Sequence, residues 1–287
     1  MFFQVRHTTR FDYSRPVLLE PHTVRLRPRS DAAQRLHRFD LTADPAAAGR
    51  SDLVDLDGNS PVHLWFTGLT EGLSLTTTFL VETLRANPFD FLVDPPHLQL
   101  PLQYPEHLSA SLRPYLDDAP PADPVADLSR DVLRDAGGEM VPFLGLLNSR
   151  VWDLSEKIIR EEGDPLPAAE TLAHGRGSCR DLTVLYMEAC RAVGIAARFV
   201  SGYQEGVAEQ RQRDLHAWAE VYVPGGGWRG YDPTLGLAVA DRHVALAAGP
   251  TSKGAAPVTG SFRGTGATST LHAEIELLVT ESPPEGE

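Results

Sequence analysis

Cysteine is the residue type in this chain best suited to nucleophilic chemistry, and it occurs twice, as Cys179 and Cys190. Cys179 follows a Gly-Arg-Gly-Ser sequence, and Ser178 and Asp181 have the Ser-x-x-Asp spacing of a capping box. We therefore expect a helix that begins at Cys179 and ends at Gly194. Unpaired N–H groups and the helix dipole at such a start stabilise a thiolate and can bind an oxyanion. Cys179 is the predicted nucleophile, and Cys190, late in an apolar stretch, a buried thiol.

The candidate base and its orienting acid lie further along the chain. His216 opens a segment, residues 216–223, in which every second residue is Ala or Val, as in a half-buried strand. A Pro-Gly-Gly-Gly turn follows, and Asp232 lies about as far beyond this turn as His216 lies before it. On an antiparallel hairpin the two are near-opposite, so the carboxylate can bind one imidazole nitrogen and leave the other facing a nucleophile. This is the Cys-His-acid form of a catalytic triad.

Four other residues are weaker candidates for these roles. Asp214 lies two residues from His216 on the same strand and points the wrong way to orient its ring. His174 lies in the loop ahead of Cys179, and Asp241 and His243 are weaker candidates as well. The cysteines and histidines lack the spacing of a metal site, and no EF-hand-like loop occurs, so we expect no metal and no cofactor.

The elements that must position these residues fall into four predicted segments. Residues 1–87 contain short strands with turns between them, such as the alternating Leu73–Leu84, and predict a small β domain. Residues 88–125 contain nine prolines and predict an extended connector over the surface or a flexible linker. Residues 126–281 form the predicted catalytic domain, and residues 282–287 a frayed tail.

Within the predicted catalytic domain, helices are expected first and strands later. Val151–Glu162 predicts an amphipathic helix that a following Gly and Pro would end. Residues 249–270 are rich in Gly, Ala, Ser and Thr and predict a loop, whereas Leu271–Thr280 alternates and predicts a final strand.

Three motifs, in this order, resemble the bacterial transglutaminase-like superfamily. They are Gly-Ser-Cys179-Arg-Asp with the Cys-Arg-Ala-Val-Gly-Ile-Ala-Ala-Arg-Phe-Val-Ser-Gly-Tyr203 that follows it, His216-Ala-Trp-Ala-Glu-Val-Tyr, and Trp228-Arg-Gly-Tyr-Asp232-Pro-Thr. The stretch Arg-His-Thr-Thr-Arg-Phe-Asp-Tyr13 is similar to the β domain that often precedes this core. The resemblance implies an α+β fold, in which a papain-like transglutaminase core, with its nucleophile helix packed on an antiparallel sheet, follows a small β-sandwich-like domain.

The resemblance also implies a chemistry, which is acyl transfer through a thioester with His216 as base and Asp232 as its orienter. Trp152 and Trp218 are candidate oxyanion or substrate contacts. Ser178 and Leu182 depart mildly from the family's pattern. Many relatives have Val or a bulkier residue at the position of Ser178, and Phe at the position of Leu182.

Three functions fit these residues. The first is hydrolysis of peptide or isopeptide bonds in a peptide or protein substrate, because water is the most abundant acceptor and nothing marks a dedicated amine site. The second is a transamidase that crosslinks glutamine side chains to amines, and the third is a non-catalytic binding or scaffolding protein that retains the core.

Composition excludes other classes of partner. The formal net charge is −13, most of it carried after residue 100, which disfavours nucleic acid and anionic membrane surfaces. No apolar run approaches the roughly 18 residues of a membrane helix, and the first residues lack the features of a signal peptide. The chain has only two cysteines, and this small number suits a reducing compartment. We therefore expect a cytoplasmic protein. The oligomeric state is left open.

Overall fold

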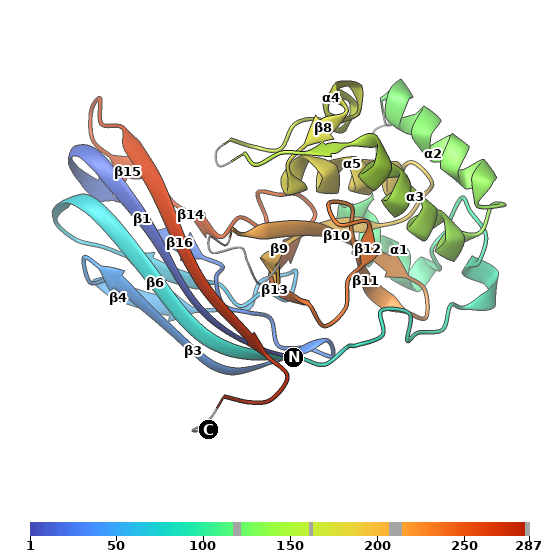
Figure 1. Cartoon of the computed structure of the whole chain (residues 1–287). Coiled ribbons are helices and arrows are strands. Elements are labelled where there is room, and N and C mark those ends of the chain that lie inside the picture. Colours follow the sequence, from blue (N-terminus) through green and yellow to red (C-terminus); the bar gives the residue numbers. More distant parts are fainter. Residues whose placement is uncertain (117–121, 161–162, 207–213, 285–287) are drawn as a thin grey trace.

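The computed structural model describes residues 1–116, 122–160, 163–206 and 214–284 (Figure 1). Two antiparallel sheets form an N-terminal β domain, and a third sheet packs with helices into what we call the mixed domain. The first sheet has five strands, in which β1 pairs with β6 on one side and with β16 on the other. Its strands are β1 (Phe2–Leu19), β3 (Gln34–Asp44), β6 (Leu69–Thr83), β15 (Phe262–Arg263) and β16 (Ser269–Thr280).

The second sheet of the β domain has four short strands in the order β14-β2-β5-β4. They are β2 (His22–Val24), β4 (Gly49–Asp52), β5 (Val62–Trp65) and β14 (Val258–Thr259). The predicted alternation within β6 is confirmed, because Leu73, Leu75, Thr77, Phe79 and Val81 are all buried. Period-two burial of this kind leaves one face of the sheet on the core and the other facing solvent.

The predicted catalytic domain, residues 126–281, has to be corrected at its C-terminal end. Leu271–Thr280 does form a strand, but this strand, β16, pairs with β1 from Phe2↔Thr280 to Tyr13↔Ser269. The expected loop 249–270 contains β14 and β15, which also join the sheets of the β domain. A long strand such as β1 would expose a row of unpaired backbone groups along one edge, and β16 covers it.

The mixed domain has a five-stranded antiparallel sheet in the order β12-β11-β10-β9-β13. Its strands are β9 (Ala197–Gln204), β10 (His216–Val223), β11 (Gly227–Asp232), β12 (Leu237–Ala238) and β13 (His243–Gly249). Its helices are α1 (Glu106–Leu112), α2 (Asp123–Asp135), α3 (Met140–Leu154), α4 (Ala168–His174) and α5 (Cys179–Arg191). The architecture is the α+β fold that the sequence predicts, with helix α5 packed on the antiparallel sheet (Figure 1).

Helix α5 is the centre of the core of the mixed domain. Its inner face consists of Leu182, Leu185, Met187 and Ala189, which are all buried, as is Val193 just beyond the helix. These side chains pack on Ala and Val residues of β10. The first residue of α5 is thereby fixed against the sheet.

The predicted helix Val151–Glu162 is wrong in its position, and Glu162 itself lies outside the described residues. Helix α3 begins at Met140 and ends at Leu154, and the chain then extends into β7 (Glu156–Lys157). The reason is tertiary, since β7 pairs in parallel with β8 (Arg176–Gly177), the segment that leads into α5. A distant strand pairing overrides the helical pattern of residues 155–160.

The proline-rich connector is laid over the mixed domain and is not a loose linker in its described part. It contains the turns η1 (Pro95–His97) and η2 (Arg113–Tyr115) besides α1, whereas Pro120 and Pro121 lie outside the described residues. Leu102 is buried and its N–H donates to the carbonyl of Val193, while the Tyr104 hydroxyl donates to the carbonyl of Tyr222. The connector therefore lies on the surface as one alternative expects, but it is only partly extended because it contains α1 and the two turns. Of the predicted tail, 282–284 are largely exposed and 285–287 lie outside the description.

Two side-chain amides of the β domain bind the outer edge of β13. Gln34 accepts from the N–H of Ala245 at 2.8 Å and donates to its carbonyl at 2.9 Å. Asn59 does the same at Ala248, at 2.8 and 2.7 Å. Each amide therefore replaces the partner that a sixth strand would supply. The edge of the mixed-domain sheet depends on the β domain.

Replacing Asn59 with Ala is expected to lower the free energy of unfolding by about 2–4 kcal/mol, because the buried N–H and carbonyl of Ala248 both lose their partner. Urea unfolding measures this change. Asn87→Ala, at an exposed position where the side chain accepts only from the N–H of Phe89, is the control and should change stability by about 1 kcal/mol or less. An Asn59→Ala protein as stable as this control would show that the edge contact contributes little.

Candidate active site

The start of α5 is built as a capped helix terminus. Ser178 has the extended backbone of an N-cap residue, and the carboxylate of Asp181 accepts from its N–H and from its hydroxyl, both at 2.8 Å. The capping box predicted from the sequence is confirmed. Cys179 is therefore the first helical residue, partly exposed, with the unpaired N–H groups of the first turn around it.

Asp181 also fixes the loop that precedes the helix. Its other carboxylate oxygen accepts from the N–H of Leu166 at 2.8 Å and forms an ion pair with Arg160 at 3.2 Å. The Asp181 side chain is 0% exposed, so this charge would be costly without these partners. The position of Cys179 thus depends on contacts on both sides of the helix start.

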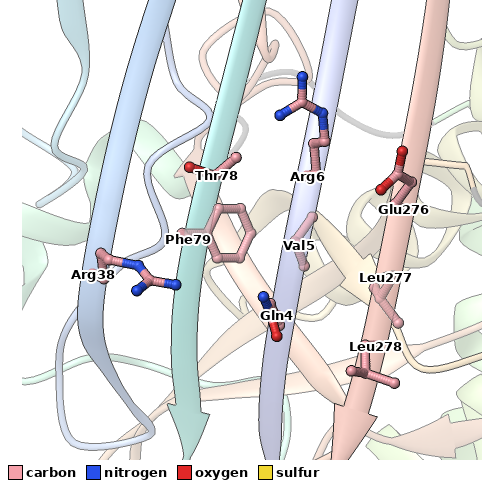
Figure 2. Close-up of a pocket in the computed structure, with 9 residues that line it drawn as sticks. All are labelled: Gln4, Val5, Arg6, Arg38, Thr78, Phe79, Glu276, Leu277 and Leu278. Atoms are coloured by element: carbon pink, nitrogen blue, oxygen red, sulfur yellow. The ribbon is translucent and has the colours of Figure 1, made fainter. Parts of the chain in front are cut away.

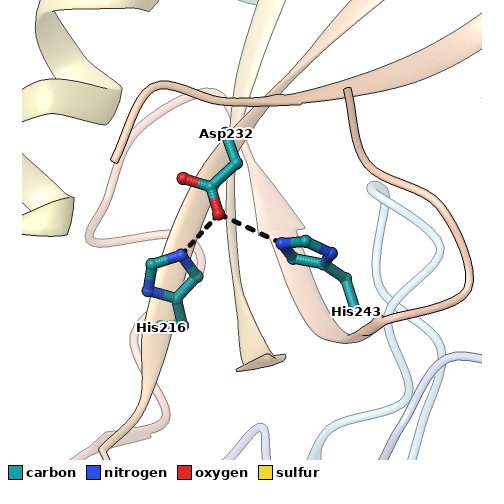
Figure 3. Close-up of side chains that lie close together, drawn as sticks. All are labelled: His216, Asp232 and His243. Atoms are coloured by element: carbon teal, nitrogen blue, oxygen red, sulfur yellow. Dashed lines mark hydrogen bonds and ion pairs between the residues drawn. The ribbon is translucent and has the colours of Figure 1, made fainter. Parts of the chain in front are cut away.

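His216 and Asp232 meet on the hairpin of β10 and β11, as the sequence predicts. The register pairs Ala219 with Tyr231, which puts Asp232 diagonally across from His216. His216 Nε2 donates to Asp232 Oδ2 at 2.7 Å (Figure 3). The other carboxylate oxygen accepts from the N–H groups of Thr234 and Leu235, at 2.9 and 3.2 Å.

The second ring nitrogen of His216 is free for Cys179, because Nε2 is bound to Asp232. Burial of the ring opposes its charge, but the Asp232 carboxylate and a hydrogen bond with Cys179 outweigh this and raise the pKa of His216 to about 10. The same ion pair holds the pKa of Asp232 below its ordinary value despite its burial. A raised histidine pKa means that this pair stabilises the fold below pH 6.5 and that the effect is lost as the pH rises through about 10.

A third side chain, His243, meets the same carboxylate oxygen. Its Nε2 lies 3.0 Å from Asp232 Oδ2, and its side chain is 2% exposed (Figure 3). The sequence ranked His243 only as a weak candidate, because the pairing of β13 with β9 that brings it here is not readable from local patterns. Of the other weak candidates, Asp214 and His174 are exposed and Asp241 is partly buried.

The two tryptophans predicted as substrate contacts have different surroundings. Trp218 is 1% exposed and packs edge-on against the His243 ring, with centroids 5.2 Å apart. It fits because Gly202 lacks a side chain, where a Cβ would come within 2.6 Å of the indole. Trp152 is 46% exposed and covers Gly236, just beyond Asp232, so it lies at the rim of the site.

His216, Asp232 and His243 also form the one group in the described part of the chain whose ligand atoms could gather around a metal, within 4.8 Å of one another. Their N–O distances of 2.7 and 3.0 Å are those of hydrogen bonds. A zinc ion at about 2.0–2.1 Å from each atom would have to replace both ring protons. The donor set as arranged fits hydrogen bonding better than metal binding.

A hollow on the outer face of the β domain is separate from this cluster. It is lined by Arg6, Arg38 and Glu276 with neighbouring residues of β1, β3, β6 and β16 (Figure 2). None of its lining residues is a cysteine or a histidine, so it offers no comparable nucleophile. None of the helices in the described ranges is long and apolar enough to cross a membrane.

Comparisons with known proteins bear on both parts of the fold. Residues 152–233 match the transglutaminase-like superfamily, and residues 3–82 match the bacterial transglutaminase-like N-terminal region. An uncharacterized protein of Mycobacterium tuberculosis is 27% identical over 99% of this chain and 94% of its own length. Another, of Mycobacterium leprae, is 24% identical over 96% of this chain and 97% of its own.

A solved structure of a candidate cysteine protease from Cytophaga hutchinsonii is similar over 99% of this chain and 93% of that chain, with a TM-score of 0.72 and 22% identity. This likeness shows that the two share their fold, including the β domain.

Iodoacetamide at pH 7 is expected to label Cys179 at least about 100-fold faster than Cys190 in the folded protein. Cys190 is 0% exposed and burial raises the pKa of its thiol, whereas Cys179 is partly exposed beside His216. Peptide mass spectrometry over time measures both rates, and in denaturant the two cysteines should react alike. Equal rates in the folded protein would remove the basis for Cys179 as the nucleophile.

Proposed function

We propose, from the premise that this chain has a transglutaminase-like core at residues 152–233, that it is an enzyme with a cysteine nucleophile. It cleaves amide bonds by acyl transfer through a thioester and passes the acyl group to water. The observation that carries the proposal is the 2.7 Å contact of His216 Nε2 with Asp232, on a ring whose pKa Cys179 also helps to raise.

The first step forms the thioester. Because the pKa of His216 is raised to about 10, its ring already holds the proton that Cys179 gives up, and Asp232 stabilises this imidazolium. The Cys179 sulfur attacks the amide carbonyl carbon, and the oxyanion of the tetrahedral intermediate lies next to the free N–H groups of the first turn of α5. His216 then gives its proton to the leaving amine as the C–N bond breaks.

The second step returns the enzyme to its starting state. His216 takes a proton from a water molecule, whose oxygen attacks the thioester carbonyl, and Cys179 leaves with a proton from His216. The product is a carboxylic acid. An amine in place of water would give a new amide, which is the transamidase alternative. Trp152, exposed at the rim of the site, is the proposed contact for the substrate around the scissile bond.

The function is tested by trapping the acyl group on Cys179 with a panel of peptides that contain glutamine side chains, backbone amides or isopeptide bonds. Mass spectrometry of the protein identifies the acyl group, and the released product is compared with and without a primary amine. Free acid in both cases supports hydrolysis, whereas a dominant amine adduct supports the transamidase. Absence of any Cys179 adduct across the panel supports the non-catalytic alternative.

Asp232→Asn is expected to lower kcat by at least about 100-fold with little change in KM, because the charge that stabilises the His216 imidazolium is lost and the wrong ring tautomer is favoured. Steady-state kinetics on the trapped substrate class measure this. Asp214→Asn, on an exposed residue near His216 in sequence, is the matched control and should retain nearly full activity. Both variants must melt near the wild-type temperature, and a crippled Asp214→Asn with a normal Asp232→Asn would refute this triad.

Chelation with EDTA is expected to leave turnover unchanged, since the side chains that could bind a metal are engaged in hydrogen bonds. Activity before and after dialysis against EDTA measures this. Loss of activity that calcium restores would instead favour the transamidase.

A further inference from the structure

The carboxylate of Asp232 has four acceptor positions, and the structure fills all of them. Oδ1 accepts from two backbone N–H groups, those of Thr234 and Leu235. Oδ2 accepts from His216 Nε2 at 2.7 Å and lies 3.0 Å from His243 Nε2. The mechanism proposed above uses the first of these ring contacts and assigns no role to the second.

His243 contacts Asp232 as a hydrogen-bond donor. An ionised carboxylate only accepts hydrogen bonds, so the proton is on Nε2. The other nitrogen, Nδ1, is buried and has no hydrogen-bond partner. The ring of His243 therefore makes one hydrogen bond, and this bond is to the carboxylate oxygen that His216 also contacts.

The His243 ring is held from several directions. Its backbone pairs with Gln204 on β9, and its ring packs against Trp218. The next residues along β13, Val244 and Leu246, belong to the core of the β domain. The strand is further bound at Ala245 and Ala248 by the two amides of the β domain. The donor is thus placed by the strand and does not follow the movements of Asp232.

We propose that His243 is a positioning residue of the active site, which holds Asp232 Oδ2 in line with His216 Nε2. The inference rests on the proposed function. Two fixed N–H groups on Oδ1 and one on Oδ2 leave the carboxylate a single orientation, and in that orientation Oδ2 faces the base. Without His243, the Asp232 carboxylate keeps its charge. Its Oδ2 atom, which orients His216, then loses a fixed hydrogen-bond donor.

Three variants separate this role from simple packing. His243→Gln has an amide that reaches the place of Nε2 and can donate to Asp232. His243→Asn has the same amide one methylene shorter, at the place of Nδ1, which has no partner. His243→Leu fills the space without any donor. The measurements are kcat and KM on the acyl substrate, the pH profile of Cys179 alkylation by iodoacetamide, and the melting temperature.

The pH profile reports on few groups near this ring. Asp232 contacts it directly, and His216 lies on the far side of the same oxygen, with ring centroids 6.2 Å apart. Arg242, just before β13, and Glu205, just after β9, form their own ion pair at 2.9 Å. A change in the profile therefore reflects the Cys179–His216 pair.

We expect His243→Gln to keep kcat within about 3-fold of wild type, and His243→Asn and His243→Leu to lose at least about 10-fold, with KM changed less than about 2-fold. The pH of half-maximal Cys179 alkylation should rise by about half a unit or more in the two impaired variants only, because their imidazolium is less well stabilised. Kinetics are compared well below the lowest melting temperature of the set.

Equal losses in His243→Gln and His243→Asn, or an alkylation profile that stays at the wild-type position in His243→Leu, would overturn the positioning role. Failure of the proposed function has a different signature. In that case the wild-type protein itself shows no acyl adduct, and its Cys179 is alkylated with the profile of an ordinary exposed thiol.

Discussion

The buried carboxylate of Asp232 is the constraint on which the rest of the site depends. It is 0% exposed and ionised, and such a group is tolerated inside a protein only if every acceptor position finds a donor. Four donors come from three places, namely β10, β13 and the turn after β11. The order of strands in the mixed sheet, with β9 between β10 and β13, is what lets two histidines reach one oxygen.

The β domain takes part in this arrangement through β13. A sheet edge has backbone groups without partners, and here side chains of Gln34 and Asn59 provide them. The chain returns to the β domain at its end, where β16 pairs along β1. The protein therefore has two cores but closes as one unit, and the strand that presents His243 belongs structurally to both. This explains why the β domain accompanies the core without contributing to the triad.

The sequence predicts contacts between residues that are close together along the chain, and it does not predict contacts between residues that are far apart along it. The helix start at Cys179 depends on Ser178 and Asp181, three residues apart, and the hairpin of His216 and Asp232 has one short turn. Both are read from spacing alone. The pairing of β13 with β9, which brings in His243, crosses a longer segment, and the contact of Gln34 with Ala245 spans 211 residues. No periodicity encodes such partners, so His243 and the true end of the mixed domain were not predictable.

Two buried carboxylates flank the site, and their partners explain why only one can act on the base. Asp181, in the same helical turn as Cys179, would oppose a thiolate there, but Arg160 lies 3.2 Å away and balances its charge. Asp232 contacts the rings of His216 and His243 through one oxygen, so its charge lies next to the imidazolium of His216. The nucleophile thus meets a compensated carboxylate on its own helix and an imidazolium across the site. Because both carboxylates are anchored by backbone N–H groups, the division of roles is set by the fold and not by side-chain mobility.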